Sequence, residues 1–345
     1  MEKLTMGLIH GGNLAAASRE FGVPAAGWID LSTGISPWSW PVPPVPDAVW
    51  QRLPEDDDGL LDSAAAYYRC AAGNLLAVPG SQHAIRQLPT LWPPGPVALP
   101  LWGYREHHHA WQLAGHRPLI YRDAGELRRL VATGAVHHAL VINPSNPTAE
   151  MTDTRLLAEL AAGLASRDGR LVVDEAFIDA DPGLSLIPHR PANAVVLRSL
   201  GKFFGLAGVR LGFVAAEAAL IAPLRDGMNP WSVSHPARWI GSRALADSAW
   251  QQAQRQRLED CSRRWLDTLA ALFPALPWRR TAHFISAETA WPQARDLYRA
   301  AGRLGLLLRL MGPVDQRGVL RLGLPASEQW SRSVDTLQQI KEMHP

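Results

Sequence analysis

Cysteine and charge of a single sign are both scarce in this chain. Cys70 and Cys261 are the only cysteines among 345 residues, too few for a disulfide framework, so we expect a protein of a reducing cytoplasm. The formal net charge is +2 and no block of Lys and Arg occurs, so the electrostatic footprint of a nucleic-acid-binding protein is missing. No apolar run reaches membrane-spanning length, and the first residues contain no apolar signal core. These absences predict a soluble, cytoplasmic protein with neither a nucleic-acid nor a membrane partner.

Short apolar runs alternate with helical stretches from residue 75 onward. The expected strands are Leu75–Val78, Val97–Leu99, Pro118–Tyr121, Ala139–Ile142, Leu171–Val173 and Val195–Leu197. Between them lie helix-like segments such as Thr152–Ser166, for which Thr152 or Asp153 is the expected N-cap. Strands separated by helices of this length imply a mostly parallel sheet, in which ligands bind at the carboxyl ends of the strands.

The change of pattern near residue 235 predicts two domains. We expect a large α/β domain over residues 31–234 and a smaller α+β domain that combines residues 1–30 with residues 235–345. A single long helix is expected over residues 237–272. The polar motifs that follow the strands of the large domain are therefore the candidates for chemistry.

Asp174 and Lys202 both come just after predicted strands. A carboxylate at such a place could bind Mg²⁺ in a nucleotide hydrolase, but the phosphate loop GxxxxGK[ST] is absent, because Gly201-Lys202 is followed by Phe203. Lys202 alone could be a surface lysine whose stem lies on apolar residues. The pair suggests more, since pyridoxal phosphate needs a lysine for its imine and an anion beside its ring nitrogen.

A cradle for the cofactor phosphate is also present. Gly80, Ser81 and Gln82 follow a strand and open a helix, where backbone N–H groups can bind phosphate oxygens. Taken alone, these residues are more typical of an ordinary turn and helix cap. Ser199 could add a hydroxyl and Arg210 a charge-assisted bond.

Two further residues complete the candidate cofactor set. Asn146, in the run Asn143–Thr148, could donate to the cofactor's phenolate oxygen, although Asn-Pro steps often mark only a turn. Tyr104 could stack on the ring or be a core aromatic. The consecutive histidines at 107–109 and 137–138 raise a metal hypothesis, but they show no zinc-ligand spacing, and we interpret them as solvated faces with His107 near Tyr104.

In combination these motifs resemble a known family. Their order and spacing are those of fold-type-I pyridoxal-phosphate enzymes, close to the histidinol-phosphate aminotransferase-like branch: Gly80–Gln82, Tyr104, Asn143–Thr148, Asp174–Phe177, Ser199–Lys202 and Arg210. Within that branch the chain resembles the L-threonine-O-3-phosphate decarboxylases of cobalamin biosynthesis, on the segments His10–Asn13, Asp174–Phe177, Arg198–Phe203 and Pro230–Val233. The resemblance covers nearly the whole chain.

The resemblance implies a fold, an activity and a site. The fold would be that of the aspartate-aminotransferase-like pyridoxal-phosphate transferases, in a homodimer. The activity would be decarboxylation of L-threonine O-3-phosphate to (R)-1-aminopropan-2-yl phosphate and CO₂, with Lys202, Asp174 and Tyr104 as catalytic residues. His10, Arg309 and Arg321 would bind the substrate, with Arg321 on its carboxylate and Arg309 toward its phosphate.

Three positions depart from the relatives, and two rival functions stay open. Phe177 stands where aminotransferases carry a tyrosine, Leu53 where many relatives have a tyrosine that reaches the neighbouring subunit's cofactor, and Ala149 where a glycine usually closes the Asn-Pro-Thr motif. A histidinol-phosphate-type aminotransferase shares every step until the choice of bond. A non-catalytic binding protein is the other alternative, although a scaffold has no reason to keep Lys202, Asp174 and Asn146 together.

Overall fold

The computed structural model describes residues 10–24 and 27–343, and the chain divides into two compact units. The larger unit comprises Trp38–Asn146 and Glu150–Arg257, and the smaller unit comprises Met1–Pro37, Pro147–Ala149 and Leu258–Pro345. Sequence patterns placed the domain limits near residues 30 and 235, whereas the helix that starts at His235 belongs to the larger unit. The limits of independently folding domains stay a prediction.

A seven-stranded sheet forms the centre of the larger unit. Its strands are β2 (Leu75–Val78), β3 (Pro96–Pro100), β4 (Arg117–Tyr121), β5 (His138–Ile142), β6 (Arg170–Asp174), β7 (Ala194–Ser199) and β8 (Gly212–Ala215). Their order is β2-β8-β7-β6-β5-β3-β4, and all neighbours are parallel except β8, which is antiparallel to both β2 and β7. The mostly parallel sheet is therefore confirmed, as are the six strands expected from the apolar runs. β8 was not predicted.

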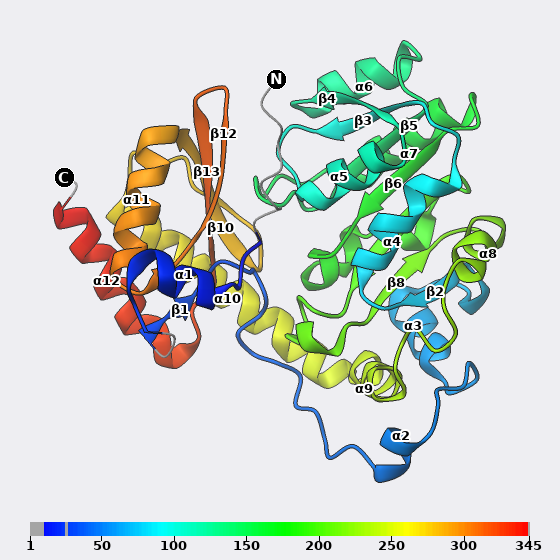
Figure 1. The fold of residues 1–345 in the computed structure, drawn as a ribbon, viewed down its shortest axis with the longest axis horizontal. Coiled ribbons are helices and arrows are strands. Elements are labelled where there is room, and N and C mark those ends of the chain that lie inside the picture. Colours follow the sequence, from blue (N-terminus) through cyan, green and yellow to red (C-terminus); the bar gives the residue numbers. More distant parts are fainter. Residues whose placement is uncertain (1–9, 25–26, 344–345) are drawn as a thin grey trace. The chain divides into compact units, whose positions relative to one another are not determined.

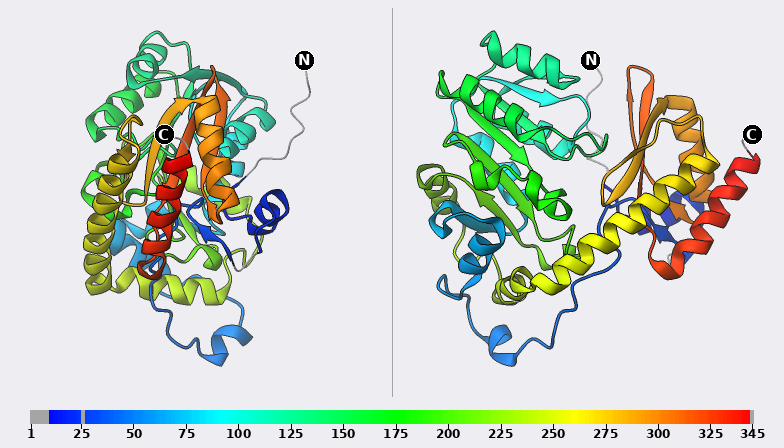
Figure 2. Two further views of the ribbon diagram at one scale, coloured as in Figure 1. Left: turned by 90° about the vertical axis from the view of Figure 1, so that its left-hand side faces the viewer. Right: turned by 180° about the vertical axis from the view of Figure 1, so that it is seen from behind.

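Helices cover both faces of this sheet (Figures 1 and 2). The α-helices of the larger unit are α2 (Asp47–Gln51), α3 (Leu60–Tyr68), α4 (Ser81–Gln87), α5 (Arg105–Leu113), α6 (Ala124–Ala132), α7 (Thr154–Ala165), α8 (Ala218–Asp226) and α9 (His235–Ala246). Short 3-10 helices occupy Ala72–Asn74, Leu88–Leu91, Ile178–Ala180, Pro182–Leu184, Ile187–His189 and Ala207–Val209. Asp153 caps α7 by accepting a hydrogen bond from the Arg155 N–H, as one of the two expected N-caps.

The alternation of side chains along the strands assigns polar residues to the two faces of the sheet. Val172 and Leu197 are buried in the apolar core that also contains Ala84 and Ile85 of α4 and Trp111 of α5. Because residues two apart on a strand share a face, Asp174 and Ser199 point to this α4–α5 side. Arg198 lies between Leu197 and Ser199 and so points to the opposite face.

The prediction of a single helix over residues 237–272 is wrong in one respect, because the segment forms two helices. α9 ends at Ala246, and α10 (Ser248–Leu272) begins after Asp247, whose backbone is not helical. Asp247 uses its side chain twice: Oδ1 accepts from the Trp250 N–H at 3.0 Å and Oδ2 from the Trp40 indole at 3.0 Å. A residue that caps the second helix cannot also continue the first.

Within its described residues, the smaller unit contains two sheets and three further helices. Its helices are α1 (Leu14–Phe21), α11 (Trp291–Arg303) and α12 (Trp330–Met343), together with the C-terminal part of α10 and a 3-10 turn at Ser327–Gln329. β1 (Ile29–Asp30) pairs in parallel with β11 (Leu306–Leu307). The second sheet, β12-β13-β10-β9, is antiparallel and consists of Arg309–Val314, Arg317–Gly323, Phe284–Ala290 and Arg279–Arg280. Across residues 10–24 and 27–343, no helix combines the length and the apolar character needed to cross a membrane.

Candidate active site

The carboxyl ends of the parallel strands bring the predicted cofactor residues of the larger unit to one edge of its sheet. Gly212 at the start of β8 is in register with Val78 on one side and with Ser199 on the other. Asp174 is in register with Leu197 of β7 and with Ile142 of β5. β8 runs antiparallel, so its first residue and the preceding Arg210 reach the same edge at which the other strands end.

Asp174 is a buried carboxylate with both oxygens engaged. Its side chain is 5 % exposed, Oδ2 lies 2.8 Å from His107 Nε2, and Oδ1 accepts from the Ala176 N–H at 3.0 Å. An ionised carboxylate only accepts, so His107 donates through Nε2. The prediction that the histidines at 107–109 and 137–138 form solvated faces is wrong for His107, which is 1 % exposed, and for His138, which is 5 % exposed.

His107 is a candidate site residue that the sequence patterns missed. Its position beside Tyr104 was expected, and the two rings meet edge to face with centroids 6.3 Å apart. A signal for its burial is present in the sequence, because His107, Ala110 and Trp111 lie three and four residues apart and form the buried stripe of α5. Next to it, burial lowers the pKa of His108 to about 4.

Lys202 lies in the turn that follows β7, half-buried among small and aromatic residues. Its Nζ is 5.3 Å from the centre of the Phe177 ring, a buried side chain that follows β6. A Cβ on the neighbouring Gly201 would lie 3.1 Å from Ala207 Cα, so this turn has little room for a larger residue. Phe177 thus meets the lysine with an aromatic face and no hydroxyl group.

The cradle predicted for a phosphate is closely built around glycine. Gly80 has φ of +75°, and a Cβ there would lie 2.6 Å from a guanidinium nitrogen of Arg210. A Cβ on Gly212 would lie 2.5 Å from the Ser81 nitrogen. The Gly80 N–H donates to the Val78 carbonyl at 2.7 Å, so of the three predicted backbone donors those of Ser81 and Gln82, in the first turn of α4, suit an anion.

Polar side chains at the ends of β3 and β5 border this edge. The Tyr104 hydroxyl donates to Gln82 Oε1 at 3.1 Å, which links the end of β3 to α4. Asn143 is fully buried and exchanges two hydrogen bonds with the backbone of Thr152, so it fixes the loop that carries Asn146, which is half-buried. Ala149 closes this loop at φ of +63°, a conformation that favours glycine, the residue that the resemblance led us to expect there.

The predicted substrate residues belong to the smaller unit. Arg309 of β12 and Arg321 of β13 are direct cross-strand partners, which places two like charges opposite each other. Arg321 is 5 % exposed and donates through Nη2 to the Ser32 carbonyl. Burial lowers the pKa of Arg321 to about 9, and the charge of Arg309 acts in the same direction, while Asp30 opposes it.

The segment that begins at His10 meets the same residues. The Gly12 N–H donates to Ser32 Oγ at 2.8 Å, and Ser32 Oγ donates to Asp30 at 2.5 Å. A Cβ on Gly11 would lie 2.5 Å from the Ser32 carbonyl oxygen, so the backbone can approach Ser32 only without a side chain. His10 itself is exposed, directly before this contact. The smaller unit thus gathers the His10 segment and Arg321 around Ser32.

Comparison with known proteins shows the family of this chain. The model of the aminotransferase class I and II family matches residues 57–307. Threonine-phosphate decarboxylase of Pseudomonas aeruginosa is 41% identical over 338 residues, which cover 97% of this chain and 98% of the relative. A second threonine-phosphate decarboxylase, from Sinorhizobium sp, is 40% identical over 69% of this chain and 71% of its own length. The chain belongs to the aminotransferase class I and II family, and within it to the threonine-phosphate decarboxylases.

A solved structure supports the fold. Histidinol-phosphate aminotransferase from Sinorhizobium meliloti, in complex with pyridoxal-5'-phosphate, superposes with a TM-score of 0.82 and covers 100% of this chain and 99% of its own. Its sequence identity is only 19%. The aspartate-aminotransferase-like fold is therefore confirmed, while the reaction has to be argued from the site and from the more similar relatives.

Proposed function

We propose that the chain is a pyridoxal-phosphate-dependent decarboxylase that converts L-threonine O-3-phosphate to (R)-1-aminopropan-2-yl phosphate and CO₂. The observation that carries the proposal is the buried Asp174–His107 pair at the sheet edge that also bears Ser199, which precedes the Lys202 turn. Identity of 41% along nearly the whole chain to a threonine-phosphate decarboxylase supports this substrate. The product would serve cobalamin biosynthesis.

The residues present fit this cofactor. Asp174 supplies an anion for a pyridinium nitrogen, and His107 holds that anion in place. The donors of Ser81, Gln82, Ser199 and Arg210, with the close approach that Gly80 permits, suit a phosphate dianion. Lys202 is the attachment point for the aldehyde, Asn146 a donor to the phenolate oxygen, and Tyr104 an aromatic face for the ring.

Each side chain then has a defined task in the reaction. When bound, pyridoxal phosphate supplies the electron sink for the pair left behind as the bond from Cα to the carboxylate breaks and CO₂ leaves. Asp174 keeps a negative charge next to the ring nitrogen, and the Phe177 ring keeps water from one side of Lys202. Lys202 would hold the cofactor aldehyde and would deliver a proton from Nζ to Cα of the substrate. Arg321 binds the substrate carboxylate and Arg309 its phosphate, with His10 nearby.

The choice between decarboxylation and transamination is tested directly. The purified protein should release CO₂ and form aminopropanol phosphate from L-threonine phosphate. It should not release CO₂ from unphosphorylated threonine at a comparable rate. It should also not transaminate histidinol phosphate with 2-oxoglutarate. Keto-acid formation without CO₂ would move the assignment to a histidinol-phosphate-type aminotransferase, and a protein that never acquires visible absorbance from pyridoxal phosphate would favour the non-catalytic alternative.

We further propose a cytoplasmic homodimer. Trp50, Leu53 and Trp231 of the larger unit are each at least 60 % exposed, an unusual display of large apolar side chains. The segments that carry them are joined by a hydrogen bond between His235 Nδ1 and the Arg52 carbonyl at 3.2 Å. A groove of about 600 Å³ between Pro54–Asp56 and Met228–Val233 adjoins them. Sedimentation of the protein, with Trp50→Ala and Trp231→Ala as variants that weaken association, tests the dimer.

A further inference from the structure

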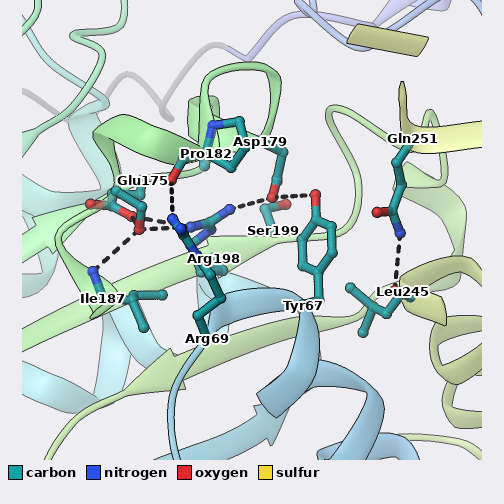
Figure 3. A network of polar contacts seen from close by, with 12 residues as sticks. Tyr67, Arg69, Glu175, Asp179, Pro182, Ile187, Arg198, Ser199, Leu245 and Gln251 are labelled. Carbon is teal, nitrogen blue, oxygen red and sulfur yellow. Dashed lines mark hydrogen bonds and ion pairs between the residues drawn. The ribbon is translucent and has the colours of Figure 1, made fainter. Parts of the chain in front are cut away.

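A buried cluster of charges lies behind the candidate cofactor edge, on the face opposite to Asp174 and Ser199. Arg198, Glu175 and Asp179 are 2 %, 0 % and 1 % exposed. Figure 3 shows Arg198 between the carboxylates of Glu175 and Asp179. Glu175 directly follows Asp174, and Arg198 directly precedes Ser199. Each member of the central ion pair is thus the chain neighbour of a candidate cofactor residue.

Arg198 is the centre of the cluster. Its Nη1 donates to Glu175 Oε2 at 3.2 Å and to Ser185 Oγ at 3.1 Å, and its Nη2 pairs with Asp179 Oδ1. Its guanidinium carbon also lies 4.6 Å from the centre of the Tyr68 ring. One planar fork therefore joins the end of β7 to the end of β6 and to the 3-10 turn at Ile178–Ala180.

The carboxylates of Glu175 and Asp179 also accept hydrogen bonds from other donors. Glu175 accepts from the Ser185 hydroxyl at 2.6 Å and from the Leu186 N–H at 2.7 Å. Asp179 accepts from the Tyr67 hydroxyl at 3.0 Å, and its backbone carbonyl accepts from Arg255 Nε at 3.1 Å. The loop after β6 is consequently fixed over residues 175–186 rather than at a single point.

The cluster is an inefficient source of stability. Burial raises the pKa of Glu175 even with Arg198 beside it, because desolvation opposes its charge. Among the described residues, Asp179 Oδ2 and Arg198 Nε are buried without a hydrogen-bond partner. Well-packed apolar residues usually stabilise a core as well as a buried ion pair does, so the geometry that the fork imposes is the more specific contribution.

We propose that Arg198, Glu175 and Asp179 form a positioning cluster that fixes the separation between Asp174 and the Ser199–Lys202 segment. If both strand ends shift by even a few tenths of an ångström, the anion for the ring nitrogen, the phosphate hydroxyl and the attaching lysine no longer match one rigid cofactor. The cluster touches no reacting atom and acts through the backbone of its neighbours. This inference rests on the proposed site.

The decisive variant is Arg198→Lys, which keeps the positive charge but cannot bond Glu175, Ser185 and Asp179 together. In the full-length holoenzyme, we expect roughly tenfold weaker retention of pyridoxal phosphate, followed by loss of the visible band on dilution, and an altered circular dichroism signal in that band. The turnover number should fall, whereas KM for the substrate should change less than twofold, because the predicted substrate arginines belong to the smaller unit. The matched control is Arg128→Lys in the exposed pair with Glu159, both 54 % exposed, which should change neither quantity.

Two outcomes separate the cluster from the site assignment. Unchanged cofactor retention and an unchanged dichroic band in Arg198→Lys, whatever its melting temperature, would overturn the positioning role and leave the site intact. If Arg198→Lys does not fold, Glu175→Gln decides by the same two readouts. A Lys202→Ala protein that still shows the wild-type visible band would instead overturn the site assignment itself.

Discussion

The two units of the molecule treat their candidate functional charges differently. In the larger unit, the anion of Asp174 is matched inside the protein, by His107 Nε2 at 2.8 Å and by a backbone N–H at 3.0 Å. In the smaller unit, Arg309 and Arg321 face each other as like charges, and burial lowers the pKa of Arg321.

We propose that this difference reflects the kind of ligand that each unit binds. The Asp174 carboxylate is already held in position by hydrogen-bond donors of the protein. It is therefore in place before a cationic ligand binds, which suits a resident cofactor. Two adjacent guanidinium groups gain most from a ligand that brings its own negative charge, as a phosphorylated amino acid does. The variants that follow test this contrast, in order of decreasing effect.

Lys202→Ala should have the largest effect of any single change. It would remove both the proposed attachment point and the proposed proton donor, so CO₂ release should fall on the order of 10⁴-fold. The visible band of the attached cofactor should vanish, and borohydride treatment should no longer label a peptide at this position. Lys341→Ala, an exposed lysine in the last turn of α12, is the control and should behave as wild type. Substantial CO₂ release by Lys202→Ala would remove Lys202 from the mechanism.

Asp174→Asn should rank next. The substitution keeps the shape but removes the preorganised charge, and the loss of such a partner lowers turnover by about 10²- to 10³-fold. His107→Asn should give a smaller loss, about tenfold, since the carboxylate stays and only one charge-assisted hydrogen bond is lost. Turnover of both proteins, measured with saturating cofactor, ranks the two. A larger loss in His107→Asn than in Asp174→Asn would mean that His107 acts in its own right.

Much of the fold and of the candidate site could be predicted from the sequence, and the parts that were missed have physical causes. Asp174 directly follows the apolar run Leu171–Val173, and Ser199 comes one residue after the apolar run Ala194–Leu197, so their shared edge could be predicted. β8 was missed because its four residues, starting at Gly212, follow a glycine-rich segment without the length of a typical strand signal. The burial of His107 was hidden because three consecutive histidines resemble a polar surface, and only their helical spacing to Trp111 indicates otherwise.

Arg309→Ala probes the smaller unit. Loss of a charge-assisted contact to phosphate is worth about 1.5–3 kcal/mol, so affinity for L-threonine phosphate should fall roughly ten- to hundredfold. Binding of unphosphorylated threonine should change far less, since it lacks the group that Arg309 would contact. Arg317→Ala, an exposed arginine of β13 that pairs with Glu288, is the matched control. Equal losses for both ligands would leave the fold and the cofactor site intact but would cancel the phosphate assignment.

The smallest expected effect is on folding stability at acidic pH, and it again differs between the two units. Among the described residues, the histidines whose pKa is lowered by burial, His83, His108 and His138, all belong to the larger unit. His138 is 5 % exposed, stacks on Trp92 with ring centroids 5.1 Å apart, and has its pKa lowered to about 4 from 6.5, chiefly by burial. Between pH 6.5 and 4 the unfolded chain therefore binds a proton that the folded unit rejects, so stability falls as the pH falls through this window.

His138→Asn should flatten that dependence. Its stability at pH 7 should be lower, because the stacking on Trp92 is lost, but the further loss between pH 7 and 4.5 should be about 1–2 kcal/mol smaller than in the wild type. Chemical unfolding followed by tryptophan fluorescence at the two pH values measures this difference. His189→Asn changes an exposed histidine of the same unit and should keep the wild-type slope. An equal slope in His138→Asn and wild type would show that folding does not change the protonation of His138, and the acid response would then have to come from other groups.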